Sequence, residues 1–366
     1  MKAMKKSVAS GAVLTGIVTV ILTLLSMISM AKVLHLMNTP SDMYGEAYGY
    51  IMVICGGIVA QALYNYLASV LRALGDSKRP LYFLVIAALL NIVLDLALVY
   101  GIRMGIKGAA IATVISQIVS GIGICIYTWM KMPELRFSLR PERIKESQSV
   151  MGEVVRYSAA SSIQQSVMNF GILMIQGLVN SYGSAVIAGY SGAIKLNTFG
   201  VTCMTTLSNG LSSFTAQNLG AGKKDRVQEG FRAGAKMGIL VSLPFVLVYF
   251  FFSEAAMGLF MKSESAEAIA AGAMFLKIVT PFYFVVSTKV MCDGVLRGGS
   301  AMLYFMTTTF TDLVLRVVLA FVFAIGFGLG STGIWLSWPF GWSISCVLSY
   351  LFYRKKPWEK RSYDTL

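Results

Sequence analysis

Long apolar stretches, each interrupted by a short polar segment, follow one another along the whole chain. A bilayer core about 30 Å thick is crossed by a helix of about 20 apolar residues. Ten stretches are long enough: 8–33, 47–71, 81–101, 108–130, 155–181, 184–214, 232–252, 268–293, 302–328 and 331–353. Gly, Pro and charge clusters separate them, as in the run from Gly75 to Pro80. The pattern predicts an all-α, polytopic membrane protein with about ten transmembrane helices.

Composition supports a protein solvated by lipid. Of the 366 residues, 56% are hydrophobic and 13% charged, whereas about 25% of the residues of a soluble domain are charged. The net charge of +14 could indicate nucleic acid, but the basic residues form short clusters between apolar runs, which argues against such a partner. The five cysteines lie in apolar stretches without CxxC spacing, so we interpret them as packing residues and expect no metal or other cofactor.

The distribution of lysine and arginine predicts the orientation. If the N-terminus is cytoplasmic, the inner segments hold 20 basic residues and the outer segments 4. The outer four are Lys32, Arg103, Lys107 and Lys262. Cytoplasmic loops carry the excess of Lys and Arg in membrane proteins. We therefore expect both termini on the cytoplasmic side of the cell inner (plasma) membrane.

An internal repeat relates the two ends of the chain at an offset of 225 residues. Val70-Leu71-Arg72 aligns with Val295-Leu296-Arg297, and Leu90, Val93 and Leu94 align with Leu315, Val318 and Leu319. Gly101, Gly105 and Gly108 align with Gly326, Gly330 and Gly333. The matched glycines predict the same short external turn in each half, and hence a parallel repeat of the kind found in transporters.

The same offset leaves residues 155–214 without a counterpart in the first half, because their equivalents would precede Met1. The simplest interpretation is a 6+6 architecture in which the first two helices are absent. The expected divisions are an N-terminal lobe of four helices at 1–131, a cytoplasmic linker at 132–153, a six-helix C-terminal lobe at 154–353 and a cytoplasmic tail at 354–366.

Four motifs, in order along the chain, resemble the multidrug and toxic compound extrusion (MATE) transporters, most closely the prokaryotic branch that includes the DinF-like proteins. They are Leu63 to Pro80 (LYNYLASVLRALGDSKRP), Asn91 to Asp95 (NIVLD), Ala216 to Gly222 (AQNLGAG) and Gly294 to Gly298 (GVLRG). The resemblance implies a monomeric secondary antiporter in the membrane lipid. It exports amphipathic, often cationic, drug-like small molecules in exchange for protons or sodium ions, by alternating access.

Asp95 is the sharpest candidate for ion coupling. Inserting a charged side chain at the centre of a membrane helix costs about 2.5–3.5 kcal/mol of free energy on insertion scales, so such a residue is expected to have a function. Asn91 lies four residues earlier on the same helix face, and Thr113 on the next helix could add a hydroxyl. Oxygen ligands suit sodium, and a buried carboxylate can equally hold a proton; a structural hydrogen bond to neighbouring helices is the alternative. The resemblance assigns the same residues to a cation site, with the Ala109 carbonyl as a further ligand.

The second half does not repeat this site. Arg316 occupies the position that corresponds to Asn91. Asp293 is a weaker acidic candidate, and its spacing to Arg297 favours a structural ion pair between the two.

A polar stripe on the 155–181 helix is expected to line the central cavity. It comprises Gln164, Gln165, Asn169 and Gln176, whose spacing roughly keeps one helix face. Lys195, in the 184–214 helix, could sense the charge of the cleft or pair with a carboxylate. Snorkelling to the interface is the equal alternative.

Other functions remain open or are disfavoured. Gly189-Tyr190-Ser191-Gly192 has the GxSG form of an intramembrane serine protease, but the only histidine, His35, lies far upstream, so we expect no enzyme. A channel is disfavoured because the sequence offers no filter-like loop. A lipid-linked oligosaccharide flippase of the same superfamily would need a strongly cationic cavity, and the predicted helices offer few basic residues. A non-transporting truncated remnant is the third alternative.

Overall fold

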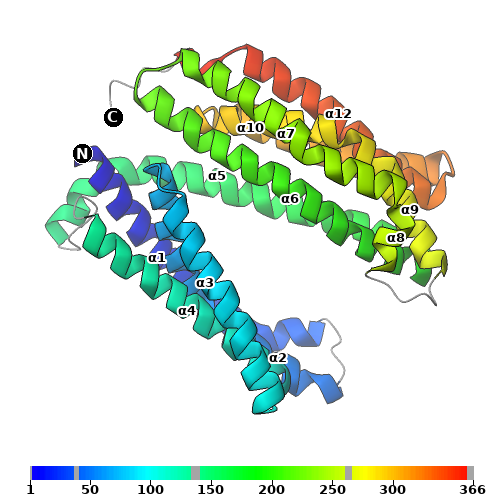
Figure 1. Ribbon diagram of the computed structural model, residues 1–366, viewed down its shortest axis with the longest axis horizontal. Helices are drawn as coiled ribbons and strands as arrows, with labels where there is room; N and C mark the ends of the chain where they lie inside the picture. The colour runs from blue at the N-terminus through cyan, green and yellow to red at the C-terminus, as the bar shows by residue number, and fades with distance from the viewer. Residues whose placement is uncertain (1, 37–40, 133–140, 260–265, 361–366) are drawn as a thin grey trace. The chain divides into compact units, whose positions relative to one another are not determined.

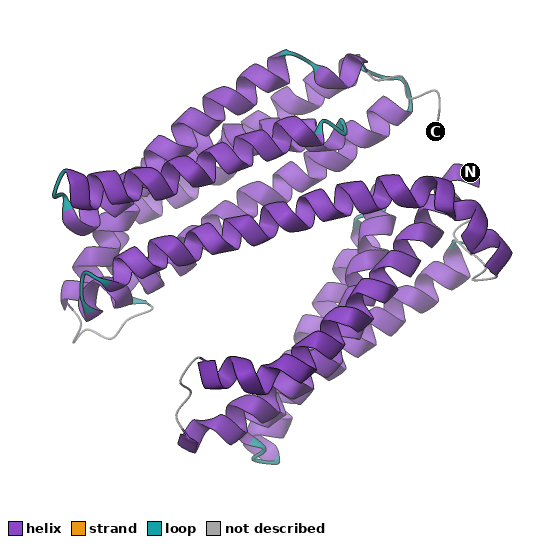
Figure 2. Ribbon diagram, turned by 180° about the vertical axis from the view of Figure 1, so that it is seen from behind, coloured by secondary structure: helices purple, strands orange, loops and turns teal. Residues whose placement is uncertain are grey.

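The computed structural model describes residues 2–36, 41–132, 141–259 and 266–360. This part of the chain is built of helices and turns and contains no strand (Figure 2). The all-α prediction is therefore confirmed for it. The basic residues Arg136, Arg140, Lys262 and Arg361, used to predict the orientation, lie outside the described residues.

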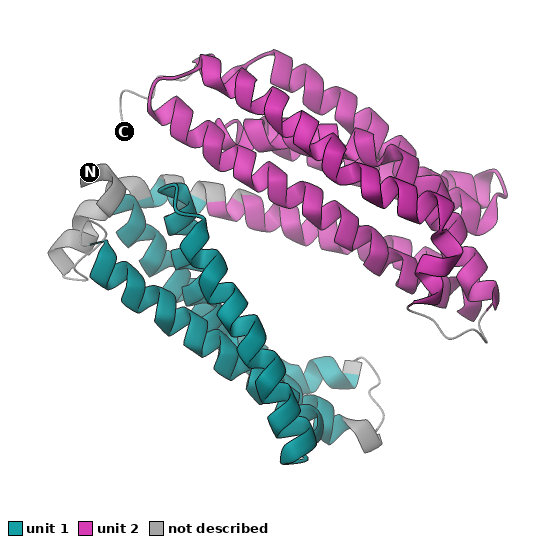
Figure 3. Cartoon of the chain, viewed as in Figure 1, with its two compact units in different colours: residues 1–156 teal, residues 157–366 magenta. Residues whose placement is uncertain are grey.

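Contacts between Cα atoms divide the chain into two compact units, residues 1–156 and 157–366 (Figure 3). Unit 1 comprises α1 (Lys2–Leu36), α2 (Ser41–Ala73), α3 (Lys78–Asp95), the π-helix η1 (Leu96–Gly101) and α4 (Gly105–Lys131) (Figure 1). The boundary falls within α5 (Pro141–Asn180).

Unit 2 contains the rest of α5 and the remaining helices. These are α6 (Ser184–Gly220), α7 (Asp225–Phe251), α8 (Ser253–Gly258), α9 (Ala266–Val279), the 3-10 turn η3 (Thr280–Phe282), α10 (Tyr283–Gly298), α11 (Met302–Phe321), the π-helix η4 (Val322–Gly326), α12 (Gly330–Arg354) and the 3-10 turn η5 (Pro357–Lys360).

Each of the ten predicted stretches coincides with a helical segment. Among the described residues, seven segments are long and apolar enough to cross a membrane by length and composition alone. Helices α5, α6 and α12 are not among them, since their apolar residues are interspersed with Ser, Thr, Asn or Gln. Large apolar side chains are exposed along the helices, for example Ile28 (75% exposed) and Leu89 (60%). Such continuous exposed apolar surface is what lipid contact requires.

The predicted single helix over 268–293 is wrong in one respect, because the structure breaks it at η3. Pro281 lacks the amide hydrogen that an α-helix needs, and its ring crowds the preceding turn. The chain therefore passes through one 3-10 turn before α10 begins at Tyr283.

The structure supports the internal repeat at the turn that follows each π-helix. Ile102 N donates to Ala97 O at 2.9 Å, and its counterpart Phe327 N donates to Val322 O at 2.9 Å. In both halves a helix ends in a π-helix, and the next helix starts at a glycine with positive φ, 58° at Gly105 and 60° at Gly330. Glycine adopts this left-handed backbone without steric cost.

Glycines of this turn also let the backbones approach. A Cβ on Gly333 would lie 2.6 Å from Ala324 N and 2.6 Å from Phe323 C, whereas a Cβ on Gly326 would meet no atom within 4 Å. We expect Gly333→Ala to destabilise the protein by about 1–3 kcal/mol through overpacking, and Gly326→Ala, the matched control in the same turn, to leave stability nearly unchanged. Thermal unfolding in detergent measures both; equal melting temperatures for the two variants would contradict the close approach.

Each unit has its own core. In unit 1, α2 packs closely on α4 through small residues, since a Cβ on Gly57 would lie 2.6 Å from Val114. Small residues are what allow membrane helices this proximity. In unit 2, the fully buried Tyr190 and Trp335 stack with ring centroids 5.1 Å apart, and Phe275 meets Trp335 edge-on at 5.3 Å.

Candidate functional site

Asp95 lies at a change of backbone geometry. It is the last residue of α3, and the π-helix η1 begins directly after it. Its Oδ1 is buried and has no hydrogen-bond partner within the described residues. π-helical turns inside α-helices frequently mark functional sites. A buried carboxylate oxygen without a donor is costly unless a proton or cation satisfies it.

Three other predicted site residues meet beside this helix. Asn91 Nδ2, one turn before Asp95, donates to Thr113 Oγ1 at 3.4 Å. The Thr113 hydroxyl in turn donates to the carbonyl oxygen of Ala109 at 3.0 Å. Hard cations prefer such carboxylate, amide, hydroxyl and carbonyl oxygens. These oxygen atoms are therefore suitable ligands for a small cation, and the carboxylate can hold a proton. All of them lie within unit 1.

The equivalent position in unit 2 holds a different arrangement. The 225-residue offset maps Asn91 to Arg316, Thr113 to Trp338 and Asp95 to Ala320. The Arg316 guanidinium lies 4.5 Å from the centre of the Trp338 ring. An Asn–Thr contact between neighbouring helices is thus replaced by an Arg–Trp contact, which places a fixed positive charge where unit 1 offers ligands.

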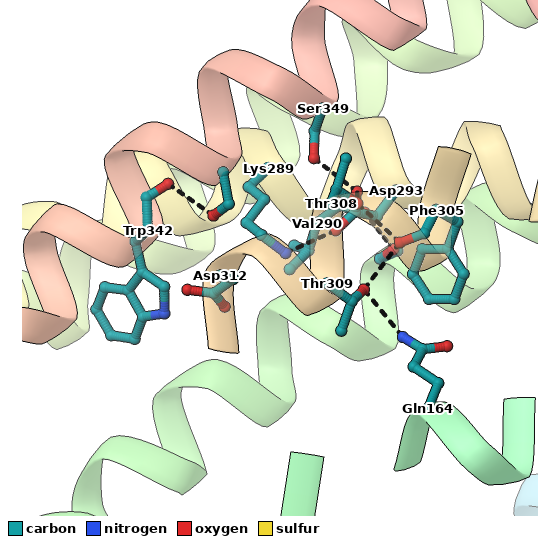
Figure 4. Close-up of polar contacts among 12 residues, drawn as sticks. Gln164, Lys289, Val290, Asp293, Phe305, Thr308, Thr309, Asp312, Trp342 and Ser349 are labelled. Atoms are coloured by element: carbon teal, nitrogen blue, oxygen red, sulfur yellow. Dashed lines mark hydrogen bonds and ion pairs between the residues drawn. The ribbon is translucent and has the colours of Figure 1, made fainter. Parts of the chain in front are cut away.

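Unit 2 instead carries a buried cluster of four charges on α10 and α11. Lys289 Nζ lies 2.8 Å from Asp293 Oδ2, and Arg316 Nη2 lies 2.6 Å from Asp312 Oδ2. The hydroxyls of Thr308 on α11 and Ser349 on α12 donate to Asp293 Oδ1 at 3.1 and 2.8 Å (Figure 4). Both oxygens of Asp293 are therefore occupied, as a buried charge requires.

The predicted ion pair between Asp293 and Arg297 is wrong, because Lys289 takes that place. Arg297 instead donates to Asn209 Oδ1 on α6 at 2.7 Å, and its guanidinium lies 5.4 Å from the Phe305 ring centre. Both cations are four residues from Asp293, so spacing alone could not choose between them. The same four-residue spacing could have revealed Asp312 and Arg316, a pair that the sequence analysis missed.

A cavity of about 250 Å³ in unit 2 is lined by this cluster. Three cations, Lys289, Arg297 and Arg316, face two carboxylates, Asp293 and Asp312. Trp338 and Trp342 form part of its wall, and the Trp342 ring centre is 6.0 Å from the Arg316 guanidinium. The charges nearly balance, so the cavity is not strongly cationic.

The predicted polar stripe does not converge on this cavity, to which α5 contributes Met168 among the described residues. Gln164 Nε2 donates to Thr309 Oγ1 on α11 at 2.9 Å (Figure 4). The other members bond along their own helix: Gln165 to Asn169 at 3.5 Å, and Gln176 to Asn180 at 2.8 Å. Lys195 is exposed on α6. The structure thus ties Gln164 into the unit 2 core, and the role of the stripe and Lys195 in substrate contact stays a prediction.

Comparison with known proteins places these features in a family. The MatE family matches residues 1–97 and 159–322. YpnP of Bacillus subtilis, a probable multidrug resistance protein, is 30% identical over 328 residues, which cover 89% of this chain and 72% of YpnP. The probable multidrug resistance protein NorM of Thermotoga maritima is 28% identical over 366 residues, covering 98% of this chain and 78% of NorM.

The fold of this chain is also found in a solved structure. An outward-facing multidrug resistance MATE family transporter of the MOP superfamily superposes with a TM-score of 0.88, at 20% sequence identity, over 98% of this chain and 84% of that chain. At this identity the likeness concerns the fold, which is that of a polytopic helical membrane protein.

Proposed function

Because this chain belongs to the MatE family of membrane transporters, we propose that it is a secondary active antiporter that exports amphipathic, often cationic, small molecules in exchange for protons or sodium ions. The predicted family is confirmed, and the protein is a transporter rather than an enzyme. Placement in the DinF-like branch, in the cell inner membrane and with both termini cytoplasmic is part of the proposal.

The observation that carries the proposal is the buried, unpartnered Oδ1 of Asp95 beside the linked Asn91, Thr113 and Ala109. A group of this kind inside a membrane helix is a functional site by default. It supports binding of the coupling ion at Asp95, with the amide, hydroxyl and carbonyl oxygens as further ligands when that ion is sodium.

Coupling then follows from competition between the ion and the substrate. With Asp95 ionised, unit 1 carries a negative charge that favours an organic cation. When a proton or sodium ion binds there, that charge is neutralised, α3 and α4 adjust around the ion, and the substrate is released outward. The two lobes alternate access by rocking about the binding region. Because Arg316 supplies a fixed cation at the equivalent position of unit 2, one coupling site per chain is proposed.

The charge balance of the unit 2 cavity supports export of organic cations over flipping of a pyrophosphate-linked lipid. Two of its three cations, Lys289 and Arg316, are paired with carboxylates. A site for pyrophosphate would present unpaired basic groups to the ligand.

Proteoliposomes test the function directly. With the purified chain inserted, we expect the fluorescent cation ethidium to move against its gradient when either a pH gradient or a sodium gradient is imposed, and to stop when an ionophore collapses it. The gradient that works identifies the ion. If the inserted protein moves no ethidium or other amphipathic cation under either gradient, the antiport proposal fails and the non-transporting alternative stands.

A further inference from the structure

A groove of about 470 Å³ lies between α6 and α7, two helices of unit 2 that run side by side (Figure 1). Small residues form its floor: Gly210 on α6, and Gly230, Ala233 and Gly234 on α7. A Cβ added to Gly210 would meet no atom within 4 Å, so this part of the groove is open. Two glycines of α7 are closed off by side chains of α6 instead, since a Cβ on Gly230 would lie 2.4 Å from Phe214 Cε1 and a Cβ on Gly234 would lie 3.2 Å from Leu211 Cδ2. The open part of the groove is therefore the α6 side, at Gly210.

The walls of the groove are apolar and continue for several helical turns. Leu207, Leu211 and Phe214 on α6 and Met237 on α7 line the groove together with the small residues. From Arg226 at one end to Met237 at the other, the groove follows α7 for about 16 Å at a rise of 1.5 Å per residue. A long, narrow apolar groove that is open to the surroundings of a membrane protein fits a flexible hydrocarbon chain.

One end of the groove is basic. The guanidinium of Arg226 lies 5.6 Å from the centre of the Phe214 ring, which holds it over the mouth. Lys223 and Lys224, both exposed, precede it in the turn between the two helices. Two carboxylates lie at the same end: Glu229 lines the mouth, and the exposed Asp225 precedes Arg226. Three cations therefore face two carboxylates, which leaves a net positive charge for an anion.

We propose that this groove binds an anionic phospholipid, with one acyl chain against the apolar lining beside Gly210 and the phosphate beside Arg226. The cations lie at one end only, where α7 begins, and the rest of the groove is apolar, which matches the polarity of a lipid read from headgroup to tail. Basic pockets at the cytoplasmic ends of membrane helices recognise anionic headgroups. The site rests on the proposed cytoplasmic placement of the 221–224 turn, and it is independent of which ion or drug is transported.

Native mass spectrometry of the purified full chain tests the site, with dioleoylphosphatidylglycerol as the anionic probe and dioleoylphosphatidylcholine as the neutral one. We expect the chain to retain a phosphatidylglycerol molecule in preference to phosphatidylcholine. Gly210→Leu fills the open part of the groove and should lose that molecule. Gly177→Leu on α5 is the matched control, since a Cβ there also meets no atom within 4 Å and the residue does not line the groove; it should retain the lipid.

The headgroup contact is tested separately with Arg226→Gln. This variant should lose the preference for phosphatidylglycerol over phosphatidylcholine, whereas Arg232→Gln, an exposed arginine on the same helix, should keep it. Equal retention by the wild type and Gly210→Leu overturns the acyl-chain site, and an unchanged preference in Arg226→Gln overturns the headgroup contact. If Gly210→Leu instead dissociates a dimer while lipid adducts persist, the groove seats a second copy of the chain and the lipid proposal is wrong.

Discussion

Replacing Asp95 with asparagine is expected to abolish gradient-driven export while leaving the protein folded. The substitution keeps the size of the side chain but removes the negative charge. The amide cannot take up a proton at neutral pH, and it binds a sodium ion much more weakly than a carboxylate does. Loss of a charged ligand costs about 3 kcal/mol of binding, which corresponds to about a 100-fold lower rate at a fixed ion concentration. Ethidium transport in proteoliposomes under the gradient that drives the wild type measures this effect.

Asp76→Asn is the matched control for this substitution. Asp76 also lies in unit 1, in the turn before α3, where its side chain is 11% exposed and pairs with the half-exposed Arg79 of α3 at 3.4 Å. Its Oδ1 also accepts a hydrogen bond from Arg79 N at 3.2 Å. Asparagine keeps that acceptor, and an ion pair with an exposed partner contributes about 0–1 kcal/mol, so transport should change little. Asp95→Asn should melt no lower than the wild type, because a neutral side chain is less costly inside a membrane helix. Wild-type export by Asp95→Asn, with the same dependence on the gradient, would refute the coupling role.

The architecture could be predicted from the sequence because two signals are strong and local. Apolar stretches of membrane-spanning length predicted where each helix lies, apart from the break at Pro281, but not where each helix ends. The largest difference is α5, which begins at Pro141, within the predicted linker 132–153, because its first turns are polar. The glycines at 105 and 330 occupy backbone positions with positive φ in both halves, so their matching spacing reported a real structural constraint. Repeat identity at such positions reflects geometry more than ancestry alone, since few other residues adopt that backbone conformation.

The candidate site could be predicted only where its residues share one helix or adjacent helices. Asn91 and Asp95 lie one turn apart, and Thr113 follows on the next helix, so the 3.4 Å contact between Asn91 and Thr113 needed no long-range information. The partner of Asp293 did need it. Lys289 and Arg297 are both four residues from Asp293. Arg297 instead donates a hydrogen bond to Asn209 on another helix, which leaves Lys289 as the partner of Asp293. Helical periodicity carries no information on such a distant acceptor.

Removing the partner of Asp293 is expected to cause the largest loss of stability. In Lys289→Met the carboxylate stays buried with only the hydroxyls of Thr308 and Ser349 to satisfy it. Breaking a buried ion pair by deleting one partner costs about 3–5 kcal/mol, because the remaining charge is uncompensated. Thermal unfolding in detergent should show a melting temperature lower by several degrees. Lys277→Met is the control, since its pair with Glu254 is half-exposed or more on both sides and should contribute little.

The double variant Lys289→Met with Asp293→Leu distinguishes the ion pair from simple packing. If the cost of Lys289→Met comes from the stranded carboxylate, removing that carboxylate as well should recover most of the lost stability, since apolar replacements of a buried pair are often neutral or stabilising. If the lysine acts through the packing of its aliphatic stem, the two losses should add instead. Recovery would also mean that the Lys289–Asp293 pair is not required for folding. Its presence would then point to the cavity that it lines, where Asp312 and Arg316 form the second pair.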